Sequence, residues 1–417
     1  MNINKEETIK RRRLFLQSVG LGLVGLLSMN SKSWAAAMET LSAGTEFANG
    51  QREMIAYPQK RKLMRITTRP PHLETPFEVF NDGAITPNDS FFVRYHLANM
   101  PLSIDPDTYR LNIVGHVDHT LSLSLAELKA LAKPVAVVAV NQCSGNSRGY
   151  SSPRVFGAQL GNGSMGNAKW VGVSVKTVLE KAGIKTGATL VSFNGLDAPV
   201  LPTTSDFIKT LAVDHAMSAE PILAWEMNDE ELPFLNGYPL KLIVPGYFGT
   251  YWVKHLSEIK VLDMPFEGHD SFFMNTAYRL PDNDCLCVPA GTVPSKTKPI
   301  AKIKVRSFIT SVHNNQQVKV GQKVNLKGIA FDGGSGIQQV QVSVDGGATW
   351  VTAILGKDLG RFSFREWHLD YVPSQKGAVA FKVKATANDG ETQPMAATWN
   401  PGGYLRNSVE TIKINVA

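Results

Sequence analysis

The stretch Val135–Gly149, VAVVAVNQCSGNSRG, places a reactive side chain at the end of a strand. Its first part, Val135–Val140, is β-branched or small and apolar, which is typical of a buried strand. The strand leads directly into Asn141, Gln142 and Cys143, and a loop of small residues that also contains Arg148 follows. A nearby cation favours the thiolate form of a cysteine, which binds metals or attacks electrophiles. A lone cysteine is more often a packing residue, but these polar, glycine-rich surroundings predict a chemical role for Cys143.

The chain around this stretch mixes short strands with a few helices. Leu111–Val114 and Leu121–Leu123 alternate like strands. A capping box at Ser124 predicts a helix over 124–131, and a second helix is expected over Val175–Ala182, before a glycine. We therefore predict an α+β fold for a first domain, residues 58–293.

For a second domain, residues 294–417, the sequence predicts β structure only. It begins with a Pro, Lys and Thr-rich segment, Pro294–Pro299, which predicts a linker. Beyond it, apolar residues recur with a period of two over 340–344 and Ala378–Ala387, and a hairpin turn is expected at 345–347. Short strands at this spacing predict an immunoglobulin-like sandwich. The full length of 417 residues is in keeping with two domains.

The N-terminus has the features of an export signal. Arg12–Gln17 reads RRLFLQ, an apolar stretch follows over Val19–Leu27, and small residues stand at Ala35–Ala37. This pattern predicts a cleaved twin-arginine signal peptide over residues 1–37, and hence a protein exported after folding to the periplasm, with no membrane attachment after cleavage. The alternatives are a short membrane anchor and a buried helix with a basic start.

Charge and cysteine content exclude several classes of protein. Residues 1–37 hold six basic and two acidic side chains, so the rest of the chain carries about +3 of the total of +7. That balance does not suggest a nucleic-acid partner. The chain has 3 cysteines and no CxxCH motif, so no covalent c-type haem is expected in it. Cys285 and Cys287 lie two apart, and the sequence leaves open whether they form a disulfide or stay reduced.

A second candidate segment is SFFVRYHL, residues 90–97. Alternation along a strand would place Phe92, Arg94 and His96 on one face, which is unusual for a core strand because it buries a cation. One interpretation is a strand with a solvated edge. The other is a binding face, in which Arg94 and Arg148 converge on one thiolate and clamp a doubly charged oxyanion.

Several of these segments together resemble the molybdenum domain of the sulfite oxidase family, which includes plant nitrate reductases. The matching segments are FFVRYH, VNQCSGNSR, GNAKWVGV, NGYPLKLIVPGYFGTYWVKHL and WNPGGYLRN, and they run in family order from Phe91 to Asn407. The resemblance is greatest to bacterial sulfite dehydrogenases, whose molybdenum subunit carries no haem. It implies a sulfite-oxidase-type molybdopterin domain followed by a dimerisation domain.

The resemblance also implies roles for individual residues. Cys143 matches the cysteine that binds molybdenum beside the pterin. Arg94 and Arg148 match arginines of the anion pocket, and Tyr278 matches the active-site tyrosine. Val93, Tyr95 and His96 match a stretch that lies against the pterin, and His96 is also a catalytic candidate. The positions that hold the pterin and its phosphate are matched by Asp197, Asn236, Lys241, Trp252, Val253 and Lys254. Without the resemblance, Asp197 is expected to be a turn residue, Tyr278 a packing residue, and Asn236, Lys241 and Lys254 surface residues.

The sequence departs from the family at some of these positions. Asn236 and Lys241 stand where animal and plant enzymes tend to have His and Arg, and a lysine lacks the bidentate fork of an arginine. Pro401–Gly403 occupies the region of a further anion-pocket arginine, and whether Arg406 replaces that arginine is open. The chain has no cytochrome b5 domain.

The resemblance implies that the chain oxidises sulfite to sulfate at a molybdenum–molybdopterin centre and passes electrons to an external periplasmic cytochrome c. Both a homodimer and a heterodimer with a haem subunit are open. The first alternative is a related molybdenum oxidoreductase acting on another sulfur compound, as a sulfane sulfur dehydrogenase subunit or a sulfoxide reductase. The second is a cofactor-free periplasmic binding or adhesion protein.

Overall fold

The computed structural model describes residues 52–417, which belong to one compact unit. The predicted twin-arginine motif and cleavage site lie outside these residues and stay predictions. Among the described residues, no helix has the length and apolar character needed to cross a membrane.

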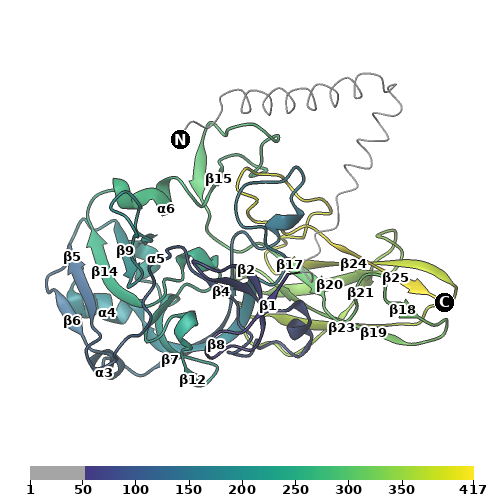
Figure 1. Ribbon diagram of the computed structural model, residues 1–417, viewed down its shortest axis with the longest axis horizontal. Helices are drawn as coiled ribbons and strands as arrows, with labels where there is room; N and C mark the ends of the chain where they lie inside the picture. Colours follow the sequence, from purple (N-terminus) through teal and green to yellow (C-terminus); the bar gives the residue numbers. More distant parts are fainter. Residues whose placement is uncertain (1–51) are drawn as a thin grey trace, which may run out of the picture. The chain divides into compact units, whose positions relative to one another are not determined.

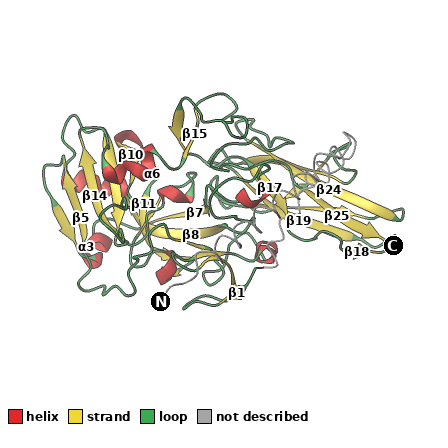
Figure 2. Cartoon of the chain, turned by 45° about the horizontal axis from the view of Figure 1, so that its top comes forward, coloured by secondary structure: helices red, strands yellow, loops and turns green. Residues whose placement is uncertain are grey.

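The structure is mostly β, and its described helices are few and short (Figures 1 and 2). The longest, α4 (Val175–Ala182), has 8 residues, and the others are α3 (Leu125–Ala130), α5 (Val213–Ala216) and α6 (Phe272–Asn275). Short 3-10 turns are η2 (Phe77–Asn81), η3 (Arg148–Tyr150), η4 (Phe234–Asn236), η5 (Gly249–Tyr251) and η6 (His269–Ser271). The two predicted helices are confirmed as α3 and α4, and Ser124 and Glu127 form the predicted capping box.

Three sheets build the first domain. A four-stranded antiparallel sheet has the order β1-β2-β3-β4 (Met54–Ile55, Leu63–Thr67, His72–Glu74, Val93–Arg94). A five-stranded sheet has the order β10-β9-β14-β5-β6 (Lys209–Ala212, Leu190–Gly195, Leu256–Leu262, Leu111–Gly115, Leu121–Leu123), in which β14 and β5 are parallel. Figure 1 shows β5, β6, β9 and β14 as neighbours.

The third sheet carries Cys143. Its order is β12-β11-β8-β7 (Glu230–Glu231, Ile222–Met227, Met165–Ser174, Val135–Gln142), and β13 (Lys241–Ile243) pairs with β11. Strand β7 therefore ends one residue before Cys143, as the sequence predicts. Its burial is only partly as predicted, because Val135 is 43% exposed and full burial begins at Ala139.

Two segments differ from the sequence predictions. The expected strand over residues 90–97 is reduced to β4, because only Val93 and Arg94 pair with β3. The expected linker is not free of regular structure, because Thr297–Pro299 forms β16 and pairs with β15 (Arg279–Pro281). That pairing ties the connection to the strand that follows Tyr278. The predicted domain boundaries stay predictions.

The C-terminal part is all β, as predicted, and consists of two sheets. One has the order β17-β19-β23-β22 (Arg306–Ile309, Val324–Phe331, Arg365–Tyr371, Ile354–Leu355), and the other β18-β25-β24-β20-β21 (Gln317–Val318, Thr411–Val416, Gly377–Ala387, Ile337–Ser343, Val351–Thr352). Both contribute to one core, in which Trp367 and Phe381 are almost fully buried. The predicted alternation in β24 is confirmed, whereas the immunoglobulin-like class stays a prediction.

Candidate active site

The loop after β7 fixes the position of Cys143. The Cys143 amide donates to the Ser164 carbonyl at 2.9 Å, and the Asn146 amide donates back to the Cys143 carbonyl at 2.9 Å. The first bond extends the β7–β8 ladder by one residue, and the second closes a turn. Cys143 has a free thiol and lines a cavity of about 620 Å³, counted with its opening, which we call the catalytic cavity.

Most of the candidate residues converge on this cavity from distant parts of the chain. The candidates that line it are Arg94, Tyr95, His96, Cys143, Asp197, Asn236, Lys241, Trp252, Lys254 and Tyr278. Val93 and Val253 do not line it and are 0% and 1% exposed within hydrophobic clusters. The side chains of these two valines therefore pack the wall behind the cavity.

Arg148 lies beside the cavity rather than in its lining. Its Nε donates to the Gly402 carbonyl at 2.8 Å, and its guanidinium lies 5.0 Å from the ring centre of Tyr404. A Cβ atom on Gly145 would lie 2.8 Å from the Arg148 guanidinium carbon, so the glycine provides the space that this cation occupies. The predicted convergence of Arg94 and Arg148 on the Cys143 thiolate stays a prediction, because Arg148 does not line the cavity.

Tyr278 and His96 form a polar pair in the cavity. The Tyr278 hydroxyl and His96 Nε2 are 2.5 Å apart, and Phe207 stacks on the imidazole with a centroid distance of 3.8 Å. Burial, with Arg94 next in effect, lowers the pKa of His96 well below its ordinary value, which favours the neutral ring. Tyr278 has a φ of 56°, a left-handed conformation that is costly for a bulky residue and typical of functional sites.

Positive charge in the cavity is not balanced by carboxylates. Within residues 52–417, Arg94, Lys241 and Lys254 form no ion pair, and Asp197 is the one acidic side chain in the lining. Lys241 is 1% exposed, with its ammonium 4.6 Å from the ring centre of Trp170. Burial lowers the pKa of Lys241 to about 7 and that of Lys254 well below its ordinary value. Buried cations of this kind require an anionic ligand to remain charged.

Neutral polar atoms in the lining also lack partners. The side-chain oxygens of Asn141 and Thr250 are buried and form no hydrogen bond in the described part of the chain. A polar ligand with many donors and acceptors, such as a pterin with a phosphate, satisfies such groups together with the lysines. The polar groups of the cavity therefore fit molybdopterin, and the free thiol of Cys143 is of the kind that binds a metal.

Sequence reasoning missed several residues of the site. Asn141, Ser144, Thr250 and Phe207 line the cavity, and Lys60 donates to the Asn236 side chain at 2.5 Å. Asn141 and Ser144 flank the Cys143 motif and could have been included on that ground. Lys60 and Phe207 carry no local signal, since only the fold brings them to the site. Arg406 does not line this cavity but lines a smaller neighbouring one that shares Cys143 and Ser144 with it.

Comparison with known proteins gives consistent matches over most of the chain. Residues 97–270 match the family described as "Oxidoreductase molybdopterin binding domain", and residues 297–417 match "Mo-co oxidoreductase dimerisation domain". Sulfite oxidase of Gallus gallus is 34% identical over 365 residues, which cover 84% of this chain and 77% of the relative. Mitochondrial sulfite oxidase of Macaca fascicularis is 34% identical over 378 residues, which cover 86% of this chain and 67% of the relative.

A solved structure agrees with these matches. The sulfane dehydrogenase SoxCD from Paracoccus pantotrophus has a TM-score of 0.70 and 25% identity, and the match covers 86% of this chain and 91% of that one. Together with the cavity, the matches define the class of protein as a molybdenum–molybdopterin oxidoreductase that acts on sulfur compounds. The chain belongs to the sulfite oxidase family, as the sequence resemblance predicts. The dimerisation-domain match also supports dimer formation.

The buried lysines predict how the stability of the cofactor-free protein depends on pH. The pKa of Lys241 is about 7 in the folded chain and has an ordinary value of 10.5 when exposed. Between these values the unfolded chain binds a proton that the folded chain lacks, so the free energy of unfolding should rise as the pH increases through this window. Urea unfolding of the cofactor-free protein should show this rise, and a smaller one in Lys241→Met.

The matched control is Lys260→Met, which removes an exposed lysine of β14. This variant should keep the wild-type slope of stability against pH. An unchanged slope in Lys241→Met would contradict the assignment of an uncompensated lysine to the cavity.

Proposed function

We propose that the chain is a periplasmic sulfite dehydrogenase that oxidises sulfite to sulfate and passes the electrons to an external cytochrome c. The observation that carries the proposal is the catalytic cavity, in which a free cysteine lies among arginine and lysine side chains that have no carboxylate partner. Relatives named sulfite oxidases support sulfite as the substrate.

Cys143 and the cationic residues would hold the cofactor. When bound, molybdenum–molybdopterin supplies a two-electron redox centre. Cys143 would be the protein's ligand to molybdenum, and Lys241, Lys254 and Asn236 would bind the pterin and its phosphate. A phosphate beside Lys241 and Lys254 would restore their charged form, because an opposite charge offsets the cost of desolvation.

Arginine side chains would bind and orient the substrate. Arg94 lines the cavity with an unpaired guanidinium, which suits a doubly charged oxyanion. Arg148 would add positive potential from behind Gly145, because its own hydrogen bonds go to neutral carbonyl groups. Charges held in place before the substrate arrives cost no reorganisation during the reaction.

Tyr278 and His96 would handle protons. Sulfite and water give sulfate, two electrons and two protons, so a route for protons is needed. Neutral His96 with its proton on Nε2 would donate to the Tyr278 oxygen, which leaves the one hydroxyl hydrogen of Tyr278 for the reacting oxyanion. The electrons would leave to a separate haem protein, in a homodimer or in a complex with a haem subunit.

A second candidate function is favoured by one observation. The structural match to the sulfane dehydrogenase covers 91% of that chain, with a TM-score of 0.70. A related activity on a sulfane sulfur compound would use the same cysteine and cations. Parallel assays with sulfite and with a sulfane sulfur substrate, both with ferricyanide, distinguish the two functions.

Cys143→Ser tests the proposed function directly. Loss of a metal ligand should reduce kcat/KM for sulfite by at least about a hundredfold, since changes at outer partners of a metal site already cost about ten- to a hundredfold. The measurement is sulfite-dependent reduction of cytochrome c and of ferricyanide, with molybdenum content determined in parallel. The control Cys285→Ser/Cys287→Ser changes two cysteines outside the cavity and should keep wild-type turnover. Full turnover in Cys143→Ser, or none in the wild type, would reject the proposal.

Tyr278→Phe removes the hydroxyl and keeps the ring. It should lower kcat/KM by about a hundredfold, the lower end of the range for a positioned proton-transfer group, and should change the dependence of kcat on pH. Tyr247→Phe, at a tyrosine outside the cavity lining, serves as the control and should leave both unchanged. A normal pH profile in Tyr278→Phe would exclude a role in proton transfer.

The proposed periplasmic location depends on the twin-arginine motif. Replacing Arg12 and Arg13 by lysine should leave the protein in the cytoplasm, because the motif is read as an address. Cell fractionation with antibody detection measures this distribution. Export of the doubly substituted chain at the wild-type level would show that another signal is used.

A further inference from the structure

A second cavity adjoins the catalytic cavity. It is much smaller than the catalytic cavity and shares Cys143 and Ser144 with it. Its remaining lining includes three cations, Lys304, Arg306 and Arg406. None of these three lines the catalytic cavity, so we call this the rear cavity.

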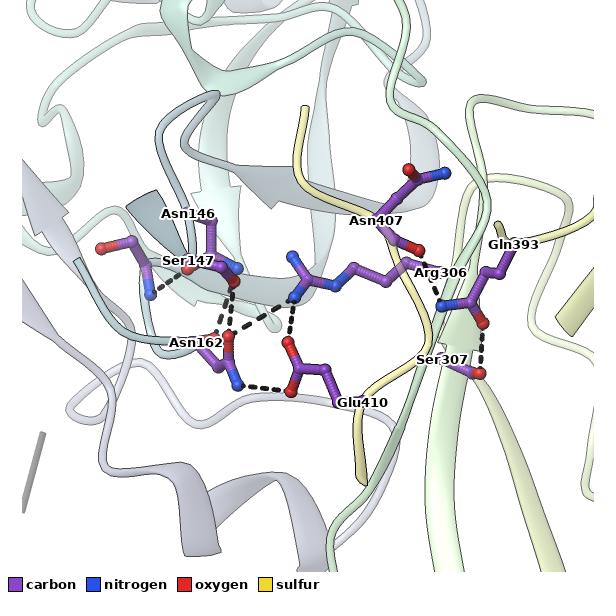
Figure 3. A network of polar contacts seen from close by, with 9 residues as sticks. Asn146, Ser147, Asn162, Arg306, Ser307, Gln393, Asn407 and Glu410 are labelled. Atoms are coloured by element: carbon purple, nitrogen blue, oxygen red, sulfur yellow. Dashed lines mark hydrogen bonds and ion pairs between the residues drawn. The ribbon is translucent and has the colours of Figure 1, made fainter. Parts of the chain in front are cut away.

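Arg306 is the most deeply buried of these cations. Its side chain is 1% exposed, and its Nη2 donates to Glu410 at 2.8 Å and to the Asn162 side chain at 3.4 Å (Figure 3). The other two donor atoms, Nε and Nη1, have no acceptor in the described part of the chain. Burial lowers the pKa of Arg306 to about 10. A buried guanidinium with unused donors is costly unless an acceptor enters.

Arg406 adds a second cation with unused capacity. Its Nε is buried without an acceptor among residues 52–417, and its guanidinium lies 5.8 Å from the ring centre of Tyr150. The preceding residue, Leu405, has a φ of 59°, and its amide donates to the Ser144 carbonyl at 3.2 Å. The strained backbone conformation is thus held by the Cys143 loop and directs Arg406 to the rear cavity.

The charges around the rear cavity leave a positive excess. Arg306 pairs with Glu410 at 2.8 Å and Lys304 pairs with Glu391 at 2.9 Å. Arg406 has no carboxylate within ion-pair distance in the described chain. The Ser144 hydroxyl, which lies in the wall shared by both cavities, is also buried without a partner. Guanidinium groups and a hydroxyl are the donors that bind tetrahedral oxyanions.

We infer that the rear cavity is a second oxyanion site, which binds a sulfate-like dianion through Arg306, Arg406 and the Ser144 hydroxyl. The site is separate from the one that Arg94 provides, and the two cavities share Cys143 and Ser144 in their linings. An anion held there places negative charge next to the catalytic cavity. Because like charges repel across a poorly solvated wall, an occupied rear cavity weakens the binding of sulfite and favours the release of sulfate.

The choice of sulfate as ligand rests on the proposed function, whereas the cation excess of the rear cavity does not. The test therefore measures anion binding without turnover. Crystals of the cofactor-loaded enzyme are soaked in selenate, and anomalous scattering from selenium locates each bound anion. Equilibrium dialysis with labelled sulfate gives the number of sites and their affinity.

The test variant is Arg406→Gln, which removes a half-buried cation without touching the Arg306–Glu410 pair. We expect selenium in the rear cavity of the wild type and at least tenfold weaker sulfate binding at that site in the variant. Arg361→Gln is the matched control, since it removes an arginine whose ion pair with Glu220 lies outside both cavities, and it should bind like the wild type. Arg306→Gln should abolish the site if the variant folds.

Two outcomes would overturn the inference: a rear cavity that holds only water in selenate-soaked wild-type crystals, or sulfate binding that is unchanged in Arg406→Gln. The proposed function fails by a different result, the absence of sulfite-dependent electron transfer. Sulfite oxidation with an empty rear cavity would reject the inference alone. Selenate binding in the rear cavity without sulfite oxidation would reject the proposed function alone.

Discussion

Unpaired positive charge within a largely apolar scaffold is the constraint on which this structure depends. Lys241 lies against Trp170 and Trp252, with ring centres 4.6 Å and 5.6 Å from its ammonium, and it has no carboxylate partner. Aromatic faces offset only part of the cost of burying a cation. The fold around it must therefore be stabilised elsewhere, by the core of the three sheets, and by the cofactor once it binds. The buried cations therefore favour ligand binding and lower the stability of the cofactor-free protein.

Much of the site could be predicted because the sequence keeps the family's motifs at positions that the fold brings together. The end of β7, the free Cys143 and the lining residues from Arg94 to Tyr278 follow from those motifs. Strand and helix patterns also predicted α3, α4 and β24, where apolar spacing and capping residues act locally. Patterning failed over residues 90–97, since alternation cannot show that only two residues have a pairing partner.

The remainder could not be predicted because it depends on contacts across long sequence distances. Lys60 reaches Asn236, and Arg148 reaches the carbonyl of Gly402, 254 residues away. No local property of these residues indicates such a partner. The displacement of Arg148 from the cavity lining has the same origin, as its guanidinium is held between Gly145, Gly157 and Tyr404. The rear cavity likewise exists only because β17 and the segment near Arg406 meet the Cys143 loop.

The bond from the Leu405 amide to the Ser144 carbonyl, with the one from Arg148 to Gly402, has a consequence for biosynthesis. The residues that close the Cys143 loop are synthesised long after the loop itself, since Gly402 follows Arg148 by 254 residues. An incomplete nascent chain can form β7 and β8 but lacks the segment that braces the arginine. A cofactor delivered before this segment has been synthesised would therefore meet an unfinished pocket.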